Sequence, residues 1–246
     1  MILCPPRPAF CISSVCLIGV AMEPLELRTE DGAITIRPMT GDYIVGADET
    51  QAEGRVEIQC CSGHAVWPNP PYVAYFRRLL DAYGLAAVTA WQGRSLVGFL
   101  PAIPLACGLP QLPHCVSAPI ETPVEEIMGA VPTPFAELKP KVLRVQCLSV
   151  TRRLQRKGIG LAMARYLVDW ARQTGWERIQ GWAFAEADTG DADRWLPSIQ
   201  FWEKAGFQRG ESCVLDPTDP ITNQSGFIFS VDFGAAGADV RQRGGL

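Results

Sequence analysis

Several features are missing from this sequence of 246 residues, and each absence excludes a class of protein. No run of about 18 consecutive apolar residues occurs, so no segment predicts a membrane-spanning helix. Positive charge is not in excess, because the formal net charge is −4, and this disfavours a nucleic-acid-binding protein. Disorder throughout is excluded by a hydrophobic content of 48% that includes seven Trp and ten Phe. What remains is a soluble globular protein of one large or two small domains.

Histidine is scarce, with two in the chain, while cysteine is not, with nine. An odd number of cysteines spread over a long chain is not the pattern of a secreted disulfide scaffold. Cys147 and Cys213 lie in apolar, strand-like runs, where a free thiol behaves as a small hydrophobic group. We therefore expect reduced cysteines and a cytoplasmic protein.

No metal site is predicted. The candidate ligands lack the C-x-x-C or H-x-x-x-H spacing of metal centres. These candidates are Cys60, Cys61, His64, His114 and Cys115.

Both ends of the chain are expected to lie outside the fold. The apolar run from Ala9 to Met22 loosely resembles a signal peptide, but its basic region is weak and no clean cleavage site follows. We predict that residues 1–21 are an N-terminal extension, with export left open as the alternative. Residues 22–233 then form one domain, and residues 234–246 form a flexible tail.

Periodicity and turn residues predict the elements of this domain. The first half contains a strand at 33–37, helices at 39–53 and 72–83, and a hairpin of strands at 85–91 and 95–103. Residues 104–140 form an insertion rich in proline, in which a continuous helix or central strand is not expected. This insertion is either a lid or binding loop, or a surface segment that covers an apolar edge.

The second half contains the clearest strand and the clearest helix of the chain. The predicted elements are a strand at 141–150, a helix at 158–174, a strand at 177–184, a helix at 197–205 and strands at 207–215 and 226–233. A strand, a helix and a strand in succession indicate a crossover onto a parallel strand. The predicted fold is therefore α/β (α+β), with a mixed, partly parallel central sheet and flanking helices.

The junction between that strand and that helix carries a cationic run in an otherwise acidic chain. Arg152, Arg153, Arg156 and Lys157 precede Gly158-Ile159-Gly160, where the helix begins. Glycine lets a ligand approach the backbone, and the free N–H groups and dipole of a helix start favour an anion such as a pyrophosphate. The alternative is a plain loop with a solvated basic run. Neither a Walker-type phosphate loop nor a dinucleotide fingerprint is present, because the spacing of Lys and Gly fits neither.

Two segments of the chain resemble motifs of the GNAT acetyltransferase superfamily. Gln155–Gly160 (QRKGIG) matches its cofactor motif of Gln or Arg, two residues, Gly, one residue, and Gly or Ala. Phe201–Phe207 (FWEKAGF) is similar to a second conserved segment of that superfamily, and the hairpin WQGRSLVGFL fits the strand pair before the cofactor motif. The resemblance spans residues 33–233 and implies a GNAT-like acyl-CoA fold.

The resemblance also implies acetyl-CoA as co-substrate, bound where the strands at 142–150 and 177–184 splay apart. The backbone of Leu148 and Val150 would pair with the pantetheine arm. The pyrophosphate would be held by the amides from Gln155 to Gly160, helped by the side chains of Arg156 and Lys157. The residues of that segment are Gln155, Arg156, Lys157, Gly158, Ile159 and Gly160. The implied reaction is direct attack of a primary amine, from a small molecule or a peptide amino group, on the thioester.

Two positions depart from the superfamily pattern, so no catalytic residue is assigned. Trp202 stands where many members have a Tyr acid, and an indole N–H does not titrate usefully. Arg144 stands where histone-type members have a Glu base, and together with Gln146 it is a candidate for binding a carboxylate or polar group of the substrate.

Three further interpretations follow from these departures. A base could come from Glu121, Glu125 or Glu126 in the insertion, or from a water relay. Alternatively, the chain is a CoA-binding sensor or scaffold that has lost its chemistry. No nucleic-acid or membrane partner is expected, and a homodimer is left open.

Overall fold

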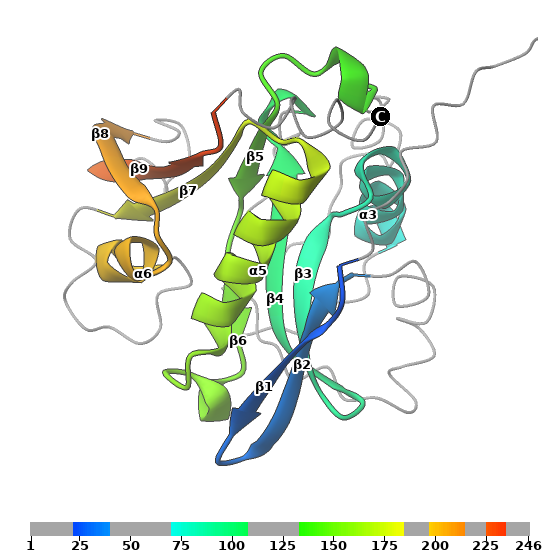
Figure 1. The fold of residues 1–246 in the computed structure, drawn as a ribbon, viewed down its shortest axis with the longest axis vertical. Helices are drawn as coiled ribbons and strands as arrows, with labels where there is room; N and C mark the ends of the chain where they lie inside the picture. Colours follow the sequence, from blue (N-terminus) through cyan, green and yellow to red (C-terminus); the bar gives the residue numbers. More distant parts are fainter. Residues whose placement is uncertain (1–21, 40–69, 108–132, 185–196, 215–224, 235–246) are drawn as a thin grey trace, which may run out of the picture.

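The computed structural model describes residues 22–39, 70–107, 133–184, 197–214 and 225–234 (Figure 1). The predicted extension at 1–21, almost all of the predicted helix at 39–53 and most of the proline-rich insertion lie outside the described residues. The predicted tail lies outside them as well, except for Gly234.

The described residues form a mixed central sheet of nine strands. The strands are β1 (Leu25–Thr29), β2 (Gly32–Pro38), β3 (Ala87–Gln92), β4 (Ser95–Pro104), β5 (Val142–Val145), β6 (Ser149–Val150), β7 (Arg178–Phe184), β8 (Gln208–Val214) and β9 (Ser225–Asp232). Their order is β1-β2-β3-β4-β5-β7-β9-β8, with β6 paired to β4. Within this sheet β5 and β7 pair in parallel and the remaining pairs are antiparallel, which confirms the predicted mixed sheet.

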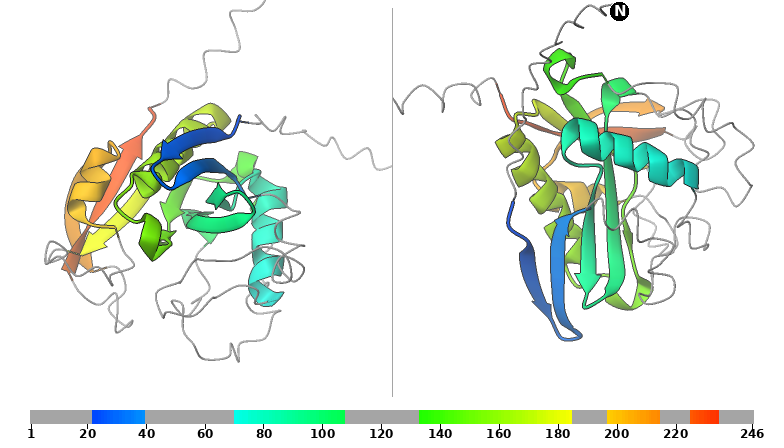
Figure 2. Two further views of the ribbon diagram at one scale, coloured as in Figure 1. Left: turned by 90° about the horizontal axis from the view of Figure 1, so that it is seen from below. Right: turned by 90° about the vertical axis from the view of Figure 1, so that its right-hand side faces the viewer.

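Helices cover both faces of the sheet (Figures 1 and 2). The α-helices are α3 (Pro70–Tyr83), α5 (Ile159–Thr174) and α6 (Ile199–Lys204), and short 3-10 helices are η1 (Leu105–Cys107), η2 (Phe135–Glu137) and η3 (Arg152–Leu154). A Cβ added at Gly98 on β4 would meet Met163 of α5, whereas the next residue, Phe99, contacts Phe76 of α3 at a ring-centroid distance of 5.9 Å. Because successive side chains of a strand point to opposite faces, α5 and α3 lie on opposite sides of β4.

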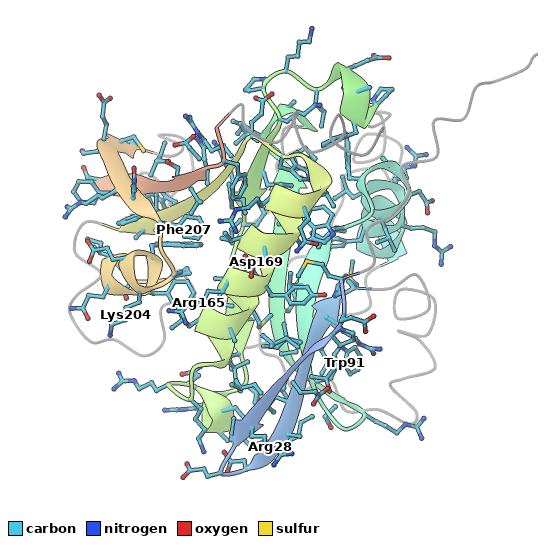
Figure 3. The ribbon with its side chains drawn as sticks, viewed as in Figure 1. Arg28, Trp91, Arg165, Asp169, Lys204 and Phe207 are labelled. Carbon is cyan, nitrogen blue, oxygen red and sulfur yellow. The ribbon has the colours of Figure 1, made fainter. Side chains whose placement is uncertain are left out.

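The predicted pattern of α5 is confirmed. Its apolar residues pack into the core, which includes Met163, Leu167 and Trp170. Arg165, Asp169 and Arg172 are exposed, and Figure 3 shows Arg165 and Asp169 on the outer side of the helix. The Arg165 guanidinium donates to the carbonyl of Lys204 at 3.1 Å, which links α5 to α6.

The prediction of one continuous strand at 141–150 is wrong. Ala102 lies opposite Val145 and Phe99 lies opposite Ser149, so residues 146–148 on one strand face residues 100–101 on the other. One extra residue on one side of an antiparallel pair is a β-bulge, and it divides the segment into β5 and β6. Pro101 lies opposite the bulge and has no N–H to donate, and such positions in sheets are typical for proline.

The first strand of the sheet was not predicted. β1 pairs with β2 through a turn at Glu30 and Asp31, and residues 25–29 are exposed or half-buried throughout. An edge strand of this kind lacks the buried apolar face that makes a strand recognisable in the sequence.

Candidate functional site

Pairing between the two parallel strands stops partway along them. Val142, Leu143 and Arg144 of β5 pair with residues 178–180 of β7, and no parallel pair follows. After the bulge the chain pairs with β4 alone, while β7 continues from Gly181 to Phe184 beside β9. The strands at 142–150 and 177–184 therefore separate beyond Arg144.

The edge of β6 that faces away from β4 carries a backbone N–H group without a described acceptor. Thr151 donates its N–H to the carbonyl of Val97 at 2.9 Å, so Val150, one residue earlier, directs its N–H and C=O away from β4. Backbone groups alternate in direction along an extended chain. The N–H and C=O of Leu148, two residues before Val150, therefore have the same orientation as those of Val150. No described residue accepts a hydrogen bond from the N–H of either one. Both are positioned to pair with one further extended chain.

The loop before α5 is held in an unusual backbone conformation. Gly158 is the N-cap of α5 with φ 84°, and Arg156 has φ 61°, which is rare for a residue with a side chain. A Cβ added at Gly158 would meet nothing within 4 Å. Alternation of left-handed and right-handed residues turns successive N–H groups toward one side and produces an anion-binding concavity.

The N–H groups of this loop lack acceptors over six consecutive residues. The first backbone hydrogen bond of α5 runs from Ala162 to the carbonyl of Gly158, at 2.9 Å. Among the described segments, nothing accepts from the N–H groups of residues 156–161. Unpaired donors at a helix start and the helix dipole together favour a bound anion.

Gln155 connects this loop to β6. Its Nε2 donates to the carbonyl oxygen of Val150 at 3.0 Å. The side chain therefore fixes the strand edge relative to the helix start. The backbone N–H of Gln155 donates to the carbonyl of Arg152 at 3.3 Å, so this amide of the predicted segment is already engaged within the protein. A Cβ added at Gly160 would lie 2.9 Å from Cδ2 of Leu148, so the absence of a side chain at Gly160 lets the two segments approach closely.

The cations of the run differ in their partners. Lys157 forms ion pairs with Glu30, at 2.8 Å, and with Asp31, both in the turn between β1 and β2. Arg153 donates to Oε1 of Gln92 at 2.7 Å. The side chains of Arg152 and Arg156 are exposed, and their guanidinium groups form no hydrogen bond or ion pair within the described ranges. Lys157 is therefore the cation of this run that is paired with carboxylates in the described residues, and the guanidinium groups of Arg152 and Arg156 are available to a bound anion.

Arg144 is the last residue of β5 that pairs with β7, and it is half-buried. Burial lowers the pKa of its guanidinium below the ordinary value, and the neighbouring Cys213 has an opposite, smaller effect on that pKa. Gln146 lies in the bulge beyond β5, where its N–H donates to the carbonyl of Pro101 at 3.1 Å. Neither Cys147 nor Cys213 forms a disulfide bond, in agreement with the predicted reduced state of these two thiols.

Trp202 has a structural role. It is 1% exposed, its Nε1 donates to the carbonyl of Trp182 at 3.1 Å, and its ring contacts Phe207 at a centroid distance of 4.7 Å. A Cβ added at Gly181 would lie 2.3 Å from Cζ2 of this indole, so the ring lies directly on β7. The side chain at the position of the superfamily's Tyr therefore packs α6 onto the sheet.

The remaining candidates fall outside the described residues. These are Cys60, Cys61, His64, His114, Cys115, Glu121, Glu125 and Glu126. The described part of the chain contains no group of three His, Cys, Asp or Glu side chains that could hold a metal ion. None of the helices in these same ranges is long and apolar enough to cross a membrane.

Comparison with known proteins identifies the family. A family model for the GNAT acetyltransferases matches residues 53–207, which is more than half of the chain. The chain therefore belongs to the GNAT acetyltransferase family. No curated protein sequence matches it.

The solved structures to which this chain is similar share little sequence identity with it. The ribosomal-protein-S18-alanine N-acetyltransferase from Escherichia coli is 13% identical, with 84% of this chain and 98% of that chain covered and a TM-score of 0.44. The protein yncA from Salmonella typhimurium, solved with its cofactor acetyl-CoA, is 11% identical, with coverages of 82% and 95% and a TM-score of 0.47. The GNAT domain of PAT from S. lividans is 13% identical, with coverages of 85% and 96% and a TM-score of 0.47.

Membership of this family supports acyl-CoA-dependent acetyl transfer, with acetyl-CoA as the co-substrate. The residues present fit such a molecule. Six consecutive free N–H groups and two exposed arginines suit its pyrophosphate, and the free edge at Leu148 and Val150 suits its extended, amide-containing arm.

Proposed function

We propose that the chain is an N-acetyltransferase that moves the acetyl group of acetyl-CoA to a primary amine of a small molecule or to a peptide amino group. The observation that carries this proposal is the run of free N–H groups at residues 156–161, at the start of α5 and beside the point where β5 and β7 separate. Acetyl-CoA supplies an activated acyl thioester.

The residues of the chain bind and orient the co-substrate. The N–H groups of 156–161 hold the pyrophosphate, and the guanidinium groups of Arg152 and Arg156 add positive charge. The backbone of Leu148 and Val150 pairs with the pantetheine arm, and Gln155 keeps that strand edge in place. Holding both reactants in one place accounts for a large part of the rate enhancement in such transfers.

The transfer itself is balanced without a further reactant. A nitrogen–carbon bond forms between the amine and the acetyl carbon, the carbon–sulfur bond breaks, and one proton of the amine is passed by way of base or water to the departing thiolate. The described residues provide no general base at this site, and a water relay or a group from 108–132 would supply that function.

A second candidate function is a CoA-binding sensor or scaffold without chemistry. It is favoured by two findings: the indole of Trp202 is fully occupied in packing, and an arginine occupies the position of the base in histone-type members. Neither side chain can act as the acid or base of the transfer.

Thiol release separates the two candidates. Purified full-length protein is incubated with acetyl-CoA and a panel of primary amines, and free thiol and acetylated amine are measured together. The enzyme proposal requires thiol and acetyl-amine in equal amounts with at least one amine. Tight binding of acetyl-CoA without turnover on any amine would favour the sensor.

The binding site itself is tested by a matched pair of glycine variants. Gly158 and Gly175 cap opposite ends of α5, both have φ 84°, and a Cβ at either would meet nothing within 4 Å. A side chain at either position costs about 1–2 kcal/mol of backbone strain. We expect Gly158→Leu to lower acetyl-CoA affinity at least about tenfold, because its side chain covers the N–H groups, and Gly175→Leu to leave that affinity unchanged. Equal affinity of both variants in calorimetry would refute the assigned site.

A further inference from the structure

One face of the sheet carries a row of polar side chains across three neighbouring strands. Arg144 of β5 lies opposite Gln180 of β7, and Gln180 lies opposite Ser230 of β9. Paired residues of neighbouring strands point to the same face. Each of the three is half-buried, so the row remains accessible to small molecules in part.

This row faces away from α5 and α6. The indole of Trp202 in α6 lies on Gly181, and Ile179 and Leu143 belong to the core. Alternation along β5 and β7 then directs Arg144 and Gln180 to the opposite face. Cys213 of β8 lies opposite Gly226, which is paired with Phe184, and therefore points to this same face.

Within the described part of the chain, the charge of Arg144 is not paired with a carboxylate. No described residue forms an ion pair or hydrogen bond with its guanidinium. Arg178 lies one step along the same face of β7, but it is paired with Asp232. Among the described residues, the polar groups nearest Arg144 on this face are Gln180, Ser230 and the thiol of Cys213, and none of them is a carboxylate. A half-buried guanidinium without a carboxylate is costly, as the downward shift of its pKa by burial also indicates.

The position of Arg144 relates this charge to the proposed reaction. It is the last paired residue before β5 and β7 separate, four residues before Leu148 on the free edge. Resting on the function proposed above, we propose that Arg144 binds a carboxylate of the acceptor, so that the acceptor is a small amine that also carries a carboxylate, as amino acids do. The planar guanidinium can donate two parallel hydrogen bonds to such a group, and Gln180 can donate a third.

The test compares matched pairs of amines that differ only in this group. Each pair is an amino acid and its carboxamide, with the amine either adjacent to the carboxylate or several carbons away. Wild-type protein is expected to show a KM for the amino acid about 10- to 100-fold below that for the carboxamide, the range expected of hydrogen bonds to a charged group. Arg144→Gln should remove this preference by raising the KM of the amino acid, with kcat and the affinity for acetyl-CoA in calorimetry little changed.

Two further variants control the interpretation. Arg144→Lys keeps the positive charge but loses the planar guanidinium with its two parallel N–H donors. This variant is expected to retain part of the preference for the amino acid over its carboxamide. Arg178→Gln removes an exposed arginine of the same face that already has a partner, and should leave the preference as in the wild type.

The outcomes separate this inference from the function on which it rests. Two outcomes contradict the inference alone. One is turnover without a preference for the amino acid over its carboxamide, and the other is an equal change in KM for both members of a pair in Arg144→Gln. If neither the amino acids nor their carboxamides are acetylated, both the proposed function and the inference are contradicted.

Discussion

The ammonium group of Lys157 donates a hydrogen bond to the carboxylate of Asp31, which joins the start of α5 to the turn between β1 and β2. Glu30 of the same turn accepts a second hydrogen bond at 2.8 Å. Asp31 and then Glu30 raise the pKa of Lys157 above its ordinary value of 10.5. Although Lys157 lies within the cofactor motif, its side chain is therefore bound to the protein itself.

We expect Lys157→Met to weaken acetyl-CoA binding less than Arg156→Met does. The guanidinium of Arg156 has no described partner, so its loss should cost about tenfold in affinity. The loss of an ammonium already paired at the surface should cost less than about twofold. Calorimetric titration of both variants with acetyl-CoA measures the difference, and equal losses would show that Lys157 leaves Asp31 to bind the co-substrate.

The same contact predicts a pH dependence of stability. Because the pKa of Lys157 is raised in the folded state, its contribution is fully present below the ordinary value of 10.5 and is lost as pH rises through the raised value. The difference in unfolding free energy between the wild type and Lys157→Met should therefore be constant near neutral pH and should vanish in strong alkali. Urea unfolding near neutral pH and in strong alkali measures this difference. Asp31→Asn removes a partner of Lys157 and should show the same dependence on pH.

Gln155 should affect binding of the co-substrate and not the chemical step. Its hydrogen bond to the carbonyl of Val150 is worth about 0.5–1.5 kcal/mol, so Gln155→Ala should raise the KM for acetyl-CoA about two- to tenfold with kcat unchanged. Gln155→Glu should do more harm, because it places a negative charge beside the anion site. Steady-state kinetics with acetyl-CoA as the varied substrate measures both, and wild-type KM in the Glu variant would be inconsistent with this role.

Trp202 should be replaceable by another aromatic residue without loss of the reaction. Trp202→Phe removes the hydrogen bond to Trp182 and part of the ring, and we expect it to lower the unfolding free energy by about 1–3 kcal/mol. The pH profile of kcat should not change, because the indole takes no part in proton transfer. A variant of normal stability that fails to turn over would assign Trp202 to the chemistry instead.

Gly181 should be among the positions least tolerant of a side chain. The Cβ of Gly181→Ala would lie 2.3 Å from the indole of Trp202, so either the ring or the strand must move, at a cost of about 1–3 kcal/mol or more. In a Trp202→Ala background the same change should cost much less, because the clash is absent. Unfolding of the single and double variants gives the coupling energy, and additive effects would show that the two residues do not interact.

The sequence predicts the parts of the site that depend on neighbouring residues. The apolar pattern of α5, its exposed stripe at Arg165, Asp169 and Arg172, and the glycine that begins the helix are all local features. The parallel pairing of β5 and β7 follows from the order of strand, helix and strand.

The parts that the sequence did not predict depend on distant segments. The bulge at 146–148 arises from pairing with β4, and the signal available for it was Pro101, a proline within an otherwise apolar strand. The partners of Lys157 lie 126 and 127 residues away in sequence, in the turn of a hairpin whose exposed strand β1 has no apolar pattern. Charge in the sequence indicated an anion site, but only the fold shows which cations remain available to it.

The N–H groups at the start of α5 form the centre of the proposed co-substrate site, and they can be observed directly. In ¹⁵N–¹H correlation spectra of the full-length protein, addition of acetyl-CoA should produce the largest shifts at the amides of residues 156–161, together with Leu148 and Val150. Inorganic pyrophosphate alone should shift 156–161 and leave Leu148 and Val150 in place, because it lacks the pantetheine arm. Saturable binding of acetyl-CoA that leaves the amides of 156–161 unshifted would contradict the assignment of this site.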